Sequence, residues 1–398
     1  MTDLGKKLRV GFDARWHNDS GVGRYVTELV RAMARTAHPT APKAVDARAP
    51  RVELVVYEDP KAPAPGLEQS DVERIAVSSG RYSAAGQIEL AWRIRRDRLD
   101  VFHSPFYALP MVTGCRVVVT IHDLIPFLFP IYGPVKLAMV RSGYRLAARK
   151  AAQVIAVSRH TAADVEKILK TLPGKVSVVY NAAAAVFQPR AQERDLAALQ
   201  EKYGVRPPYV LAASARNWRT KNLDGALRAL VAAQNSAQFQ TVIYGPEEGL
   251  RAAGEAACRQ LDLKLIGQVE SHDLAALFRQ ARAFIFPSWY EGFGLPVVEA
   301  MACGCPVVTS NGGSLAEVAG AGAQVFDPSD EKGMAGAIVA LVNDGGCATR
   351  WRQAALRRAA DFSWEKAARE TIAVYHRAYH VTPASQNRAS IPQDESLI

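Results

Sequence analysis

The sequence lacks the features that mark secreted, zinc-binding and membrane-spanning proteins. Its five cysteines are odd in number and include no Cys-x-x-Cys pair, so neither a disulfide framework nor a zinc site is indicated. No stretch approaches the roughly 18 consecutive apolar residues of a membrane span. Residues 1–13 enter a strand pattern without the apolar core of a signal peptide. We therefore expect a cytoplasmic protein.

A nicotinamide-binding fingerprint is also incomplete. The run Gly21-Val22-Gly23-Arg24-Tyr25 precedes a predicted helix, but Val26 stands where a dinucleotide-binding turn needs its third glycine. The sequence therefore disfavours a nicotinamide-dependent enzyme. The two glycines form either a plain helix start or a turn whose backbone approaches a ligand closely.

Acidic residues are scarce in the first half of the chain. Residues 1–190 carry 28 Lys and Arg against 17 Asp and Glu, whereas residues 191–398 carry 21 and 22. The net charge of +10 therefore belongs to the first half, which indicates an acidic partner for that half. Nucleic acid is a poor candidate, because neither interleaved aromatic residues nor a binding motif accompanies the charge.

Short apolar strands alternate with helices along the chain, a pattern typical of parallel sheets covered on both faces. In the first half the predicted strands are Leu8–Phe12, Val52–Tyr57, Val101–His103, Val117–Ile121 and Val154–Val157. The predicted helices there are Gly23–Thr36, Ser83–Arg96, Val135–Ala152 and Ala162–Lys170. After a polar linker, the predicted strands of the second half are Tyr209–Ser214, Gln240–Tyr244, Lys264–Ile266, Ala283–Phe286, Val307–Thr309 and Gln324–Phe326.

This alternation predicts an α/β fold of two Rossmann-like domains, spanning residues 1–190 and 191–363. Ligands of such sheets bind at the carboxyl ends of the strands, so we expect the site in the cleft between the domains. Residues 37–50 are rich in Pro, Ala and Arg and are predicted to form a surface loop. The polar tail at residues 384–398 is predicted to be disordered.

The most informative stretch runs from Trp289 to Ala302. It places Glu291 and Glu299 eight positions apart, across a Gly-x-Gly turn and the start of an apolar helix. A predicted buried strand comes just before it, and the N–H groups at the helix N-terminus favour an anion. In isolation, two glutamates at this spacing are more often solvated side chains on an ordinary βα turn.

The surrounding residues decide between these interpretations. The run Glu291-Gly-Phe-Gly-Leu-Pro-x-x-Glu299-Ala-Met-Ala-x-Gly304-x-Pro306-Val-Val-x-Ser310 resembles the donor-site signature of the retaining nucleotide-sugar glycosyltransferases of family 4. The likeness extends more loosely over nearly the whole chain. It implies the two-Rossmann fold called GT-B, in which a final helix, here Trp364–His380, crosses back onto the first domain.

The resemblance assigns roles in the second domain. Arg216 and Lys221, on the loop after a predicted strand, match the residues that bind the donor diphosphate. Glu299 matches the carboxylate that accepts hydrogen bonds from the ribose hydroxyls, and Glu291 matches the catalytic glutamate beside the transferred sugar. The main-chain groups expected to meet the donor are those of Val269, Phe293, Gly294 and Leu295.

The resemblance also assigns residues of the first domain. His122 ends a predicted strand in His-Asp-Leu-Ile-Pro and matches a histidine close to the transferred sugar, so we expect it to be catalytic. The backbone of Gly21, Val22 and Gly23 is expected to lie against the donor phosphates. Weaker candidates on the acceptor side are His103, Ser158 and Asn181.

The sequence predicts chemistry without a metal ion. No Asp-x-Asp occurs, so Arg216, Lys221 and the helix N-terminus are left to stabilise the leaving diphosphate. With Glu299 assigned to ribose, the site lacks the second carboxylate that retaining hydrolases use for a covalent step. We therefore expect attack on the same face, with the leaving phosphate as base.

The exact residues of two motifs bear on the identity of the donor sugar. The His-Asp-Leu-Ile-Pro and Gly-Val-Gly-Arg-Tyr elements look like those of mannosyl- and rhamnosyltransferases of this family. This indicates GDP-mannose as donor. The family resemblance implies a glycan or lipid-diphosphate-linked acceptor, in bacterial polysaccharide or glycolipid synthesis. The alternatives are a UDP-sugar, dTDP-rhamnose or GDP-rhamnose donor, a nucleotide-sugar epimerase of the same fold, or a non-catalytic nucleotide-sugar binder.

Basic side chains recur on one predicted helix of the first domain. Arg141, Arg145 and Arg149 follow one another at intervals of four, beside apolar residues such as Leu137 and Val140. This face is either merely solvated or binds anionic phospholipid at the inner face of the plasma membrane.

Overall fold

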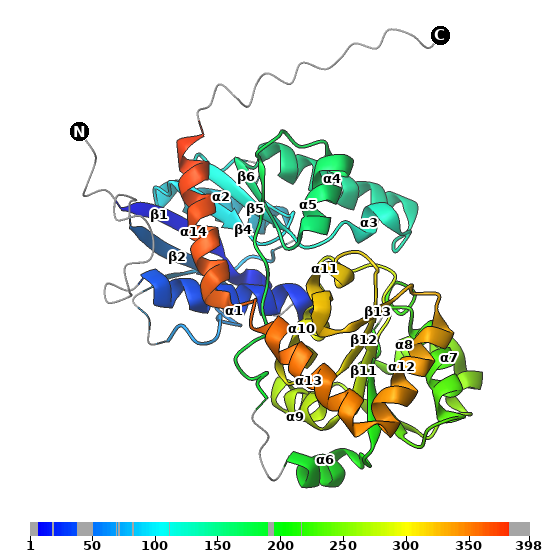
Figure 1. Ribbon diagram of the computed structural model, residues 1–398. Helices are drawn as coiled ribbons and strands as arrows, with labels where there is room; N and C mark the ends of the chain where they lie inside the picture. The colour runs from blue at the N-terminus through cyan, green and yellow to red at the C-terminus, as the bar shows by residue number, and fades with distance from the viewer. Residues whose placement is uncertain are drawn as a thin grey trace, which may run out of the picture.

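The computed structural model describes residues 7–17, 20–37, 51–68, 70, 72–81, 83–110, 112–189, 195–215 and 217–381. Arg216, residues 38–50 of the predicted surface loop and the tail at 384–398 lie outside these ranges. Two α/β domains face each other, and the boundary predicted near residue 190 falls between their sheets (Figure 1).

The first domain contains a parallel sheet of seven strands. They are β1 (Leu8–Asp13), β2 (Val52–Glu58), β3 (Glu73–Ala76), β4 (Val101–Ser104), β5 (Arg116–Ile121), β6 (Gln153–Ala156) and β7 (Val176–Val178). Their order in the sheet is β3-β2-β1-β4-β5-β6-β7. Sequence reasoning missed only β3 and β7, because these edge strands are short and carry few of the buried apolar residues that reveal a strand.

Helices cover both faces of this sheet. The helices of the domain are η1 (Ala14–Trp16), α1 (Ser20–Ala37), α2 (Ala84–Arg96), α3 (Ile125–Leu128), α4 (Pro134–Lys150) and α5 (Arg159–Leu169). Side chains such as Val10 and Phe12 pack under α1, whereas Phe102 packs with α2 and Val119 with α4 and α5 on the opposite face. The sheet is thus buried on both sides, as its apolar strands predict.

The second domain repeats this architecture with six parallel strands. They are β8 (Tyr209–Ala213), β9 (Gln240–Tyr244), β10 (Leu263–Gly267), β11 (Ala283–Phe286), β12 (Val307–Ser310) and β13 (Gln324–Phe326), in the order β10-β9-β8-β11-β12-β13. Its helices are α6 (Asp195–Tyr203), α7 (Leu223–Gln234), α8 (Glu247–Cys258), α9 (Ser271–Gln280), α10 (Leu295–Ala302), α11 (Leu315–Ala319), η2 (Gly320–Gly322), α12 (Glu331–Asn343) and α13 (Gly345–Ala359).

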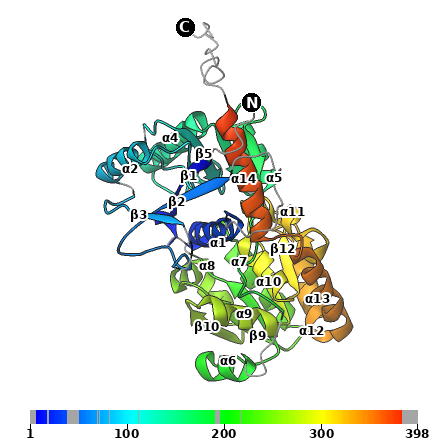
Figure 2. The ribbon, with the colours of Figure 1, turned by 90° about the vertical axis from the view of Figure 1, so that its left-hand side faces the viewer.

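The last helix, α14 (Trp364–His380), returns from the second domain to the first. Figure 2 shows it running along the first domain next to α1. Its buried side chains, including Val374, Tyr375 and Ala378, join a core that continues from one domain into the other. The predicted crossing helix is therefore confirmed, and its packing ties the two domains together.

In each sheet the strand order reverses between two central neighbours, β1 and β4 in the first domain and β8 and β11 in the second. Chain connections leave such a pair in opposite directions, and the ligands of parallel sheets are expected in the crevice beyond the carboxyl ends at that point. Among the predicted site residues, Lys221 lies in the loop that follows β8, and Glu291, Phe293 and Gly294 lie in the loop that follows β11.

Candidate active site

Lys221 and Glu291 meet at this crevice. Lys221 follows β8 and Glu291 follows β11, and Lys221 Nζ donates to Glu291 Oε1 at 2.5 Å. Ser288 Oγ donates to the same oxygen at 2.8 Å. Glu291 is buried, so the lysine supplies the positive charge that a carboxylate needs when it is removed from water. Two residues predicted for the donor site are thus in direct contact.

The glycine turn after Glu291 leads into α10. Gly294 has φ +88°, a left-handed conformation that favours glycine, and a Cβ there would collide with Leu315 as well. Phe293 is buried, with its ring centroid 5.7 Å from that of Phe362. Leu295 is the first residue of α10. The first N–H groups of a helix lack partners within the helix and favour an anion, and the donor contacts expected of the backbone of Phe293, Gly294 and Leu295 stay a prediction.

Glu299 lies inside α10 and is only 1% exposed. Its Oε1 accepts a hydrogen bond from Arg24 Nη1, which belongs to α1 of the first domain. Burial raises the pKa of the Glu299 carboxyl, and the charge of Arg24 opposes this increase. Glu291 and Glu299 therefore have different cationic partners. Sequence reasoning singled out the glycines of the Gly-Val-Gly-Arg-Tyr element and missed its arginine.

The predicted glycine turn at residues 21–23 is part of a helix. Helix α1 begins at Ser20, so Gly21, Val22 and Gly23 form its first turn instead of a loop before it. Gly21 is exposed, and a Cβ at this position would have no other atom within 4 Å. The protein itself therefore leaves room for a side chain at Gly21.

His122 follows β5 and lies against the donor loop. Its Nε2 is 2.9 Å from the carbonyl oxygen of Pro105, so this nitrogen carries the hydrogen and donates. Burial lowers the pKa of His122 to about 4, and the imidazole is neutral at physiological pH. A Cβ at Gly292 would overlap the carbonyl oxygen of His122. The close approach of these two loops brings His122 next to the Glu291 segment.

Asp123 is a further carboxylate at the same junction. Its Oδ1 accepts a hydrogen bond from the Ile125 N–H at 2.9 Å. Burial raises its pKa and the negative charge of Glu291 adds to that effect, whereas the Ile125 N–H and Lys221 oppose it. The His-Asp-Leu motif contained this signal, but sequence reasoning assigned a role only to the histidine.

Ser158 joins the two domains at the donor loop. Its hydroxyl donates to the Gly292 carbonyl at 2.7 Å, and the Thr161 hydroxyl donates to the same oxygen at 3.0 Å. Ser158 also caps the N-terminus of α5, since its Oγ accepts from the Thr161 N–H. The residue predicted for the acceptor side thus holds the Glu291 loop against the first domain.

Two further contacts close the same junction. The Tyr290 hydroxyl donates to Asp164 Oδ2 in α5 at 2.6 Å. Glu317 in α11 accepts from the backbone N–H groups of Arg159 and His160 at 2.9 and 3.0 Å. A carboxylate from the second domain therefore supplements the cap of a first-domain helix, where the helix dipole favours negative charge.

The structure does not bring His103 to this crevice. His103 is fully buried, with Nδ1 2.7 Å from the Tyr375 hydroxyl of α14 and Nε2 2.8 Å from Thr120 Oγ1. Burial lowers its pKa to about 3. Asn181 is 3% exposed, and its Oδ1 has no hydrogen-bond partner among the residues that the structure describes.

Val269 is half-buried just before α9, and it packs against the main core. Two residues later, Ser271 Oγ accepts from Arg24 Nη2 at 3.3 Å. This segment therefore borders the Arg24–Glu299 pair.

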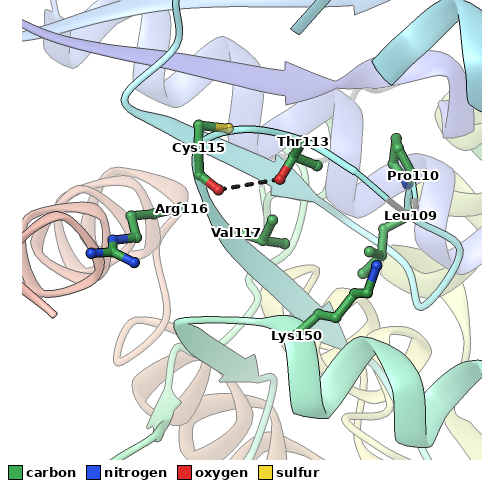
Figure 3. A pocket seen from close by; sticks show the side chains of 7 residues that line it. All are labelled: Leu109, Pro110, Thr113, Cys115, Arg116, Val117 and Lys150. Atoms are coloured by element: carbon green, nitrogen blue, oxygen red, sulfur yellow. Dashed lines mark hydrogen bonds between the residues drawn. The ribbon is translucent and has the colours of Figure 1, made fainter. Parts of the chain in front are cut away.

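A pocket elsewhere in the first domain contains none of the predicted site residues. It lies at the start of β5, whereas His122 follows the end of that strand. Its lining residues are Leu109, Pro110, Thr113, Cys115, Arg116, Val117 and Lys150. In Figure 3 the side chain of Arg116 points away from Lys150, so the two cations do not converge on one point.

Within the described ranges, no group of three or more His, Cys, Asp and Glu side chains is arranged to hold a metal ion. No helix in the same part of the chain has the length and apolar character needed to cross a membrane.

Two facing Rossmann-like domains and a returning helix define the GT-B fold class. A family model described as Glycosyltransferase Family 4 matches residues 20–184, and one described as Glycosyl transferases group 1 matches residues 198–358. The chain belongs to the glycosyltransferases that these two models describe, one model for each domain. The predictions of fold and enzyme class are thereby confirmed.

Individual relatives agree with this assignment. The chain is 28% identical over 372 residues to O-antigen chain mannosyltransferase B of Escherichia coli, which covers 89% of this chain and 96% of that protein. Sucrose-phosphate synthase from Thermosynechococcus elongatus has the same fold, with a TM-score of 0.70 at 19% identity over 94% of this chain and 99% of that one. Anabaena HepE, solved in complex with UDP-glucose, gives a TM-score of 0.68 at 18% identity over 92% and 99%.

Proposed function

We propose that this enzyme transfers mannose from GDP-mannose to a glycan or lipid-linked acceptor in bacterial polysaccharide or glycolipid synthesis, with retention of anomeric configuration. The contact between Lys221 and Glu291 at the switch-point crevice carries this proposal. The contact supports the proposal because it brings together the cation that we assign to the diphosphate and the carboxylate that we assign to the sugar, so that both can reach neighbouring parts of one donor. The near full-length similarity to an O-antigen mannosyltransferase supports mannose as the sugar.

Each group has a distinct task in this scheme. Lys221, Arg216 and the N-terminus of α10 stabilise the negative charge that grows on the leaving diphosphate. Glu291 binds hydroxyls of the transferred sugar and offsets positive charge at its anomeric carbon. Glu299 accepts hydrogen bonds from the ribose. The acceptor hydroxyl attacks from the face that the diphosphate leaves, and the diphosphate takes its proton.

His122 contributes in its neutral form. Because Nε2 donates to Pro105, Nδ1 carries the lone pair and is the ring atom able to accept from a sugar hydroxyl. Its low pKa keeps it from becoming a competing cation beside Lys221 at physiological pH.

The similarity to HepE, a protein crystallised with UDP-glucose, keeps a UDP-sugar donor as the second candidate. Thermal unfolding with GDP-mannose, UDP-glucose and GDP-rhamnose separates the two, because a ligand stabilises the fold by an amount set by its affinity. We expect the largest rise in melting temperature with GDP-mannose. A rise with UDP-glucose alone would transfer the proposal to a UDP-sugar.

Transfer itself is tested on a mannose-terminated acceptor with and without a chelator. We expect an α-linked product from the α-linked donor, identified by proton NMR, and an unchanged rate with EDTA. A β-linked product would contradict retention, and loss of activity restored by a divalent cation would contradict metal independence.

A surface of the first domain supports the further proposal that the protein binds anionic membranes. On α4, Val135 and Met139 are 75% and 71% exposed, and basic residues including Lys136, Arg145 and Arg149 are exposed beside them. Arg141 is engaged, because its Nε donates to the Pro126 carbonyl. Apolar side chains amid basic ones are typical of a helix that lies in the lipid headgroup region.

Flotation with vesicles tests this surface. We expect the wild-type protein to float with phosphatidylglycerol vesicles at low salt and the M139E/R145E variant to remain at the bottom. Equal flotation of both proteins, or none of the wild type, would contradict the membrane proposal and leave the transfer proposal standing.

A further inference from the structure

Arg24 reaches from one domain to the carboxylate of the other. It lies near the start of α1, and its guanidinium is bonded to Glu299 in α10 and is 3.3 Å from Ser271 Oγ at the start of α9. Its Cζ lies 5.2 Å from the ring centroid of Phe187. The side chain is held at three points, so its direction toward Glu299 is fixed by its surroundings.

Glu299 depends on this cation. The carboxylate is almost fully buried, and a buried charge without a partner is strongly disfavoured. Among the described residues, Glu28 of α1 and Tyr244 of β9 also interact electrostatically with Glu299. The negative charge of Glu28 disfavours ionisation of Glu299, and the tyrosine is neutral. Arg24 is therefore the group that favours the charged form of Glu299 in the described structure.

We propose that Arg24 is a positioning residue for the donor, which holds the Glu299 carboxylate in the charge state and orientation that accept the ribose hydroxyls. This inference rests on the proposed function, in which Glu299 binds ribose. A carboxylate has about four lone-pair positions on its two oxygens, so the bond to Arg24 leaves acceptor capacity for both hydroxyls. Arg24 acts on ribose recognition through Glu299.

Because Arg24 belongs to the first domain, its contact with Glu299 couples ribose binding to domain closure. Since Glu299 belongs to the second domain, its charged partner is in place only when the two domains are together. Ribose binding and domain closure therefore favour each other, as linkage requires when one state supplies the better site.

Calorimetry tests this role. It measures the affinity of the protein for GDP and UDP and for their 2′-deoxy forms. We expect wild type to bind the ribonucleotide more tightly than the deoxynucleotide. The Arg24→Ala variant should bind the ribonucleotide about 10- to 100-fold more weakly, the range for loss of a hydrogen bond to a charged group. Its affinity for the deoxynucleotide should change less, so the preference for ribose shrinks.

The matched control is Arg35→Ala, on the same helix. Arg35 is exposed and forms a surface ion pair with Glu365 at 2.9 Å, so its loss should leave both affinities unchanged. Arg24→Lys should recover part of the ribose preference because it restores a cation. If Arg24→Ala fails to fold, as judged by circular dichroism, Arg24→Gln retains side-chain length without the charge and replaces it.

A pH series and a double variant distinguish positioning from a general structural role. Without Arg24 the pKa of Glu299 rises further, so in Arg24→Ala the ribose preference should return as pH is raised. In a Glu299→Gln background, Arg24→Ala should have little additional effect on ribonucleotide affinity.

The outcomes separate the inference from the function on which it rests. If wild type binds neither GDP nor UDP, the proposed function fails and the inference fails with it. If wild type binds a nucleotide with a ribose preference that Arg24→Ala leaves intact at every pH, only the inference on Arg24 is overturned.

Discussion

The ammonium group of Lys221 lies 2.5 Å from Glu291 Oε1, which joins the loops after β8 and β11. Both residues are largely buried, with side-chain exposures of 24% and 10%. An ion pair in such surroundings stabilises both groups only while both are charged. The two residues therefore act as a unit, and removal of either one has consequences that depend on the other.

Replacement of Glu291 should separate binding from chemistry. In Glu291→Gln we expect the transfer rate to fall about 100- to 1000-fold, the effect of losing one preorganised electrostatic contact to the transition state. Nucleotide binding should persist, because Lys221 is released to contact the diphosphate. Calorimetry with GDP and a transfer assay measure the two effects. Glu331→Gln, which removes a partly exposed carboxylate paired with Arg228, is the control and should change neither. Equal losses of affinity and rate would contradict the assignment.

Replacement of Lys221 should weaken binding of the diphosphate part of the donor. Lys221→Ala is expected to weaken binding of GDP by about 10-fold or more, the usual loss for a charge-assisted hydrogen bond. Binding of GMP, which lacks the second phosphate, should change less. Lys202→Ala removes a surface cation that pairs with Asp273 in the same domain and should leave both affinities unchanged. A similar loss for GDP and GMP would mean that Lys221 supports the fold of the site and does not contact the terminal phosphate.

A side chain at Gly292 should force the domains apart. The added Cβ of Gly292→Ala would overlap the His122 carbonyl oxygen and lie 3.0 Å from Asp123 Cβ. It would also disturb the hydrogen bonds that the hydroxyls of Ser158 and Thr161 donate to the Gly292 carbonyl. We expect transfer to be nearly abolished and stability to fall by about 1–3 kcal/mol, as for other overpacked sites.

Gly336→Ala is the control for this variant. Gly336 lies within α12, where a Cβ would have no other atom within 4 Å, so alanine should stabilise the protein by up to about 1 kcal/mol. Normal transfer by Gly292→Ala would contradict the view that the closed arrangement of these loops is the active one.

The sequence predicted the parts of the site that follow from topology. Lys221 and Glu291 each come after a central strand of one sheet, and parallel strands bring such positions to a common edge. The Arg24–Glu299 contact could not be predicted in this way. Its partners are 275 residues apart and belong to different sheets, so it depends on how the domains pack.

His103 shows the opposite error. It ends its predicted strand as His122 does, and sequence reasoning placed both near the cleft. In the structure α14 covers His103 and supplies Tyr375 as a hydrogen-bond partner. The family resemblance predicted that α14 crosses back onto the first domain, but not which strand ends it would cover. Periodicity defines the buried face of a helix and leaves its destination open.

Because His103 is buried, we expect the protein to lose stability in acid. The pKa of His103 is about 3 in the folded protein and about 6.5 in an unfolded chain, because burial disfavours the imidazolium. Below pH 6.5 the unfolded state therefore binds a proton that the folded state does not. The stability that His103 contributes is fully present above pH 6.5 and declines as pH falls toward 3, by up to about 1.4 kcal/mol per pH unit.

Urea unfolding of wild type and His103→Gln at pH 7, 6 and 5 isolates this contribution from the carboxylates that titrate in both proteins. Glutamine can donate and accept hydrogen bonds as the neutral imidazole does but cannot be protonated. We expect His103→Gln to be the less stable protein at pH 7, because the imidazole ring packs edge-on against Phe12 at 4.8 Å. The difference in stability between the two proteins should narrow as pH falls, because only the wild type loses the stability that the neutral histidine contributes. A difference that does not change with pH would mean that His103 keeps the same protonation in the folded and unfolded states.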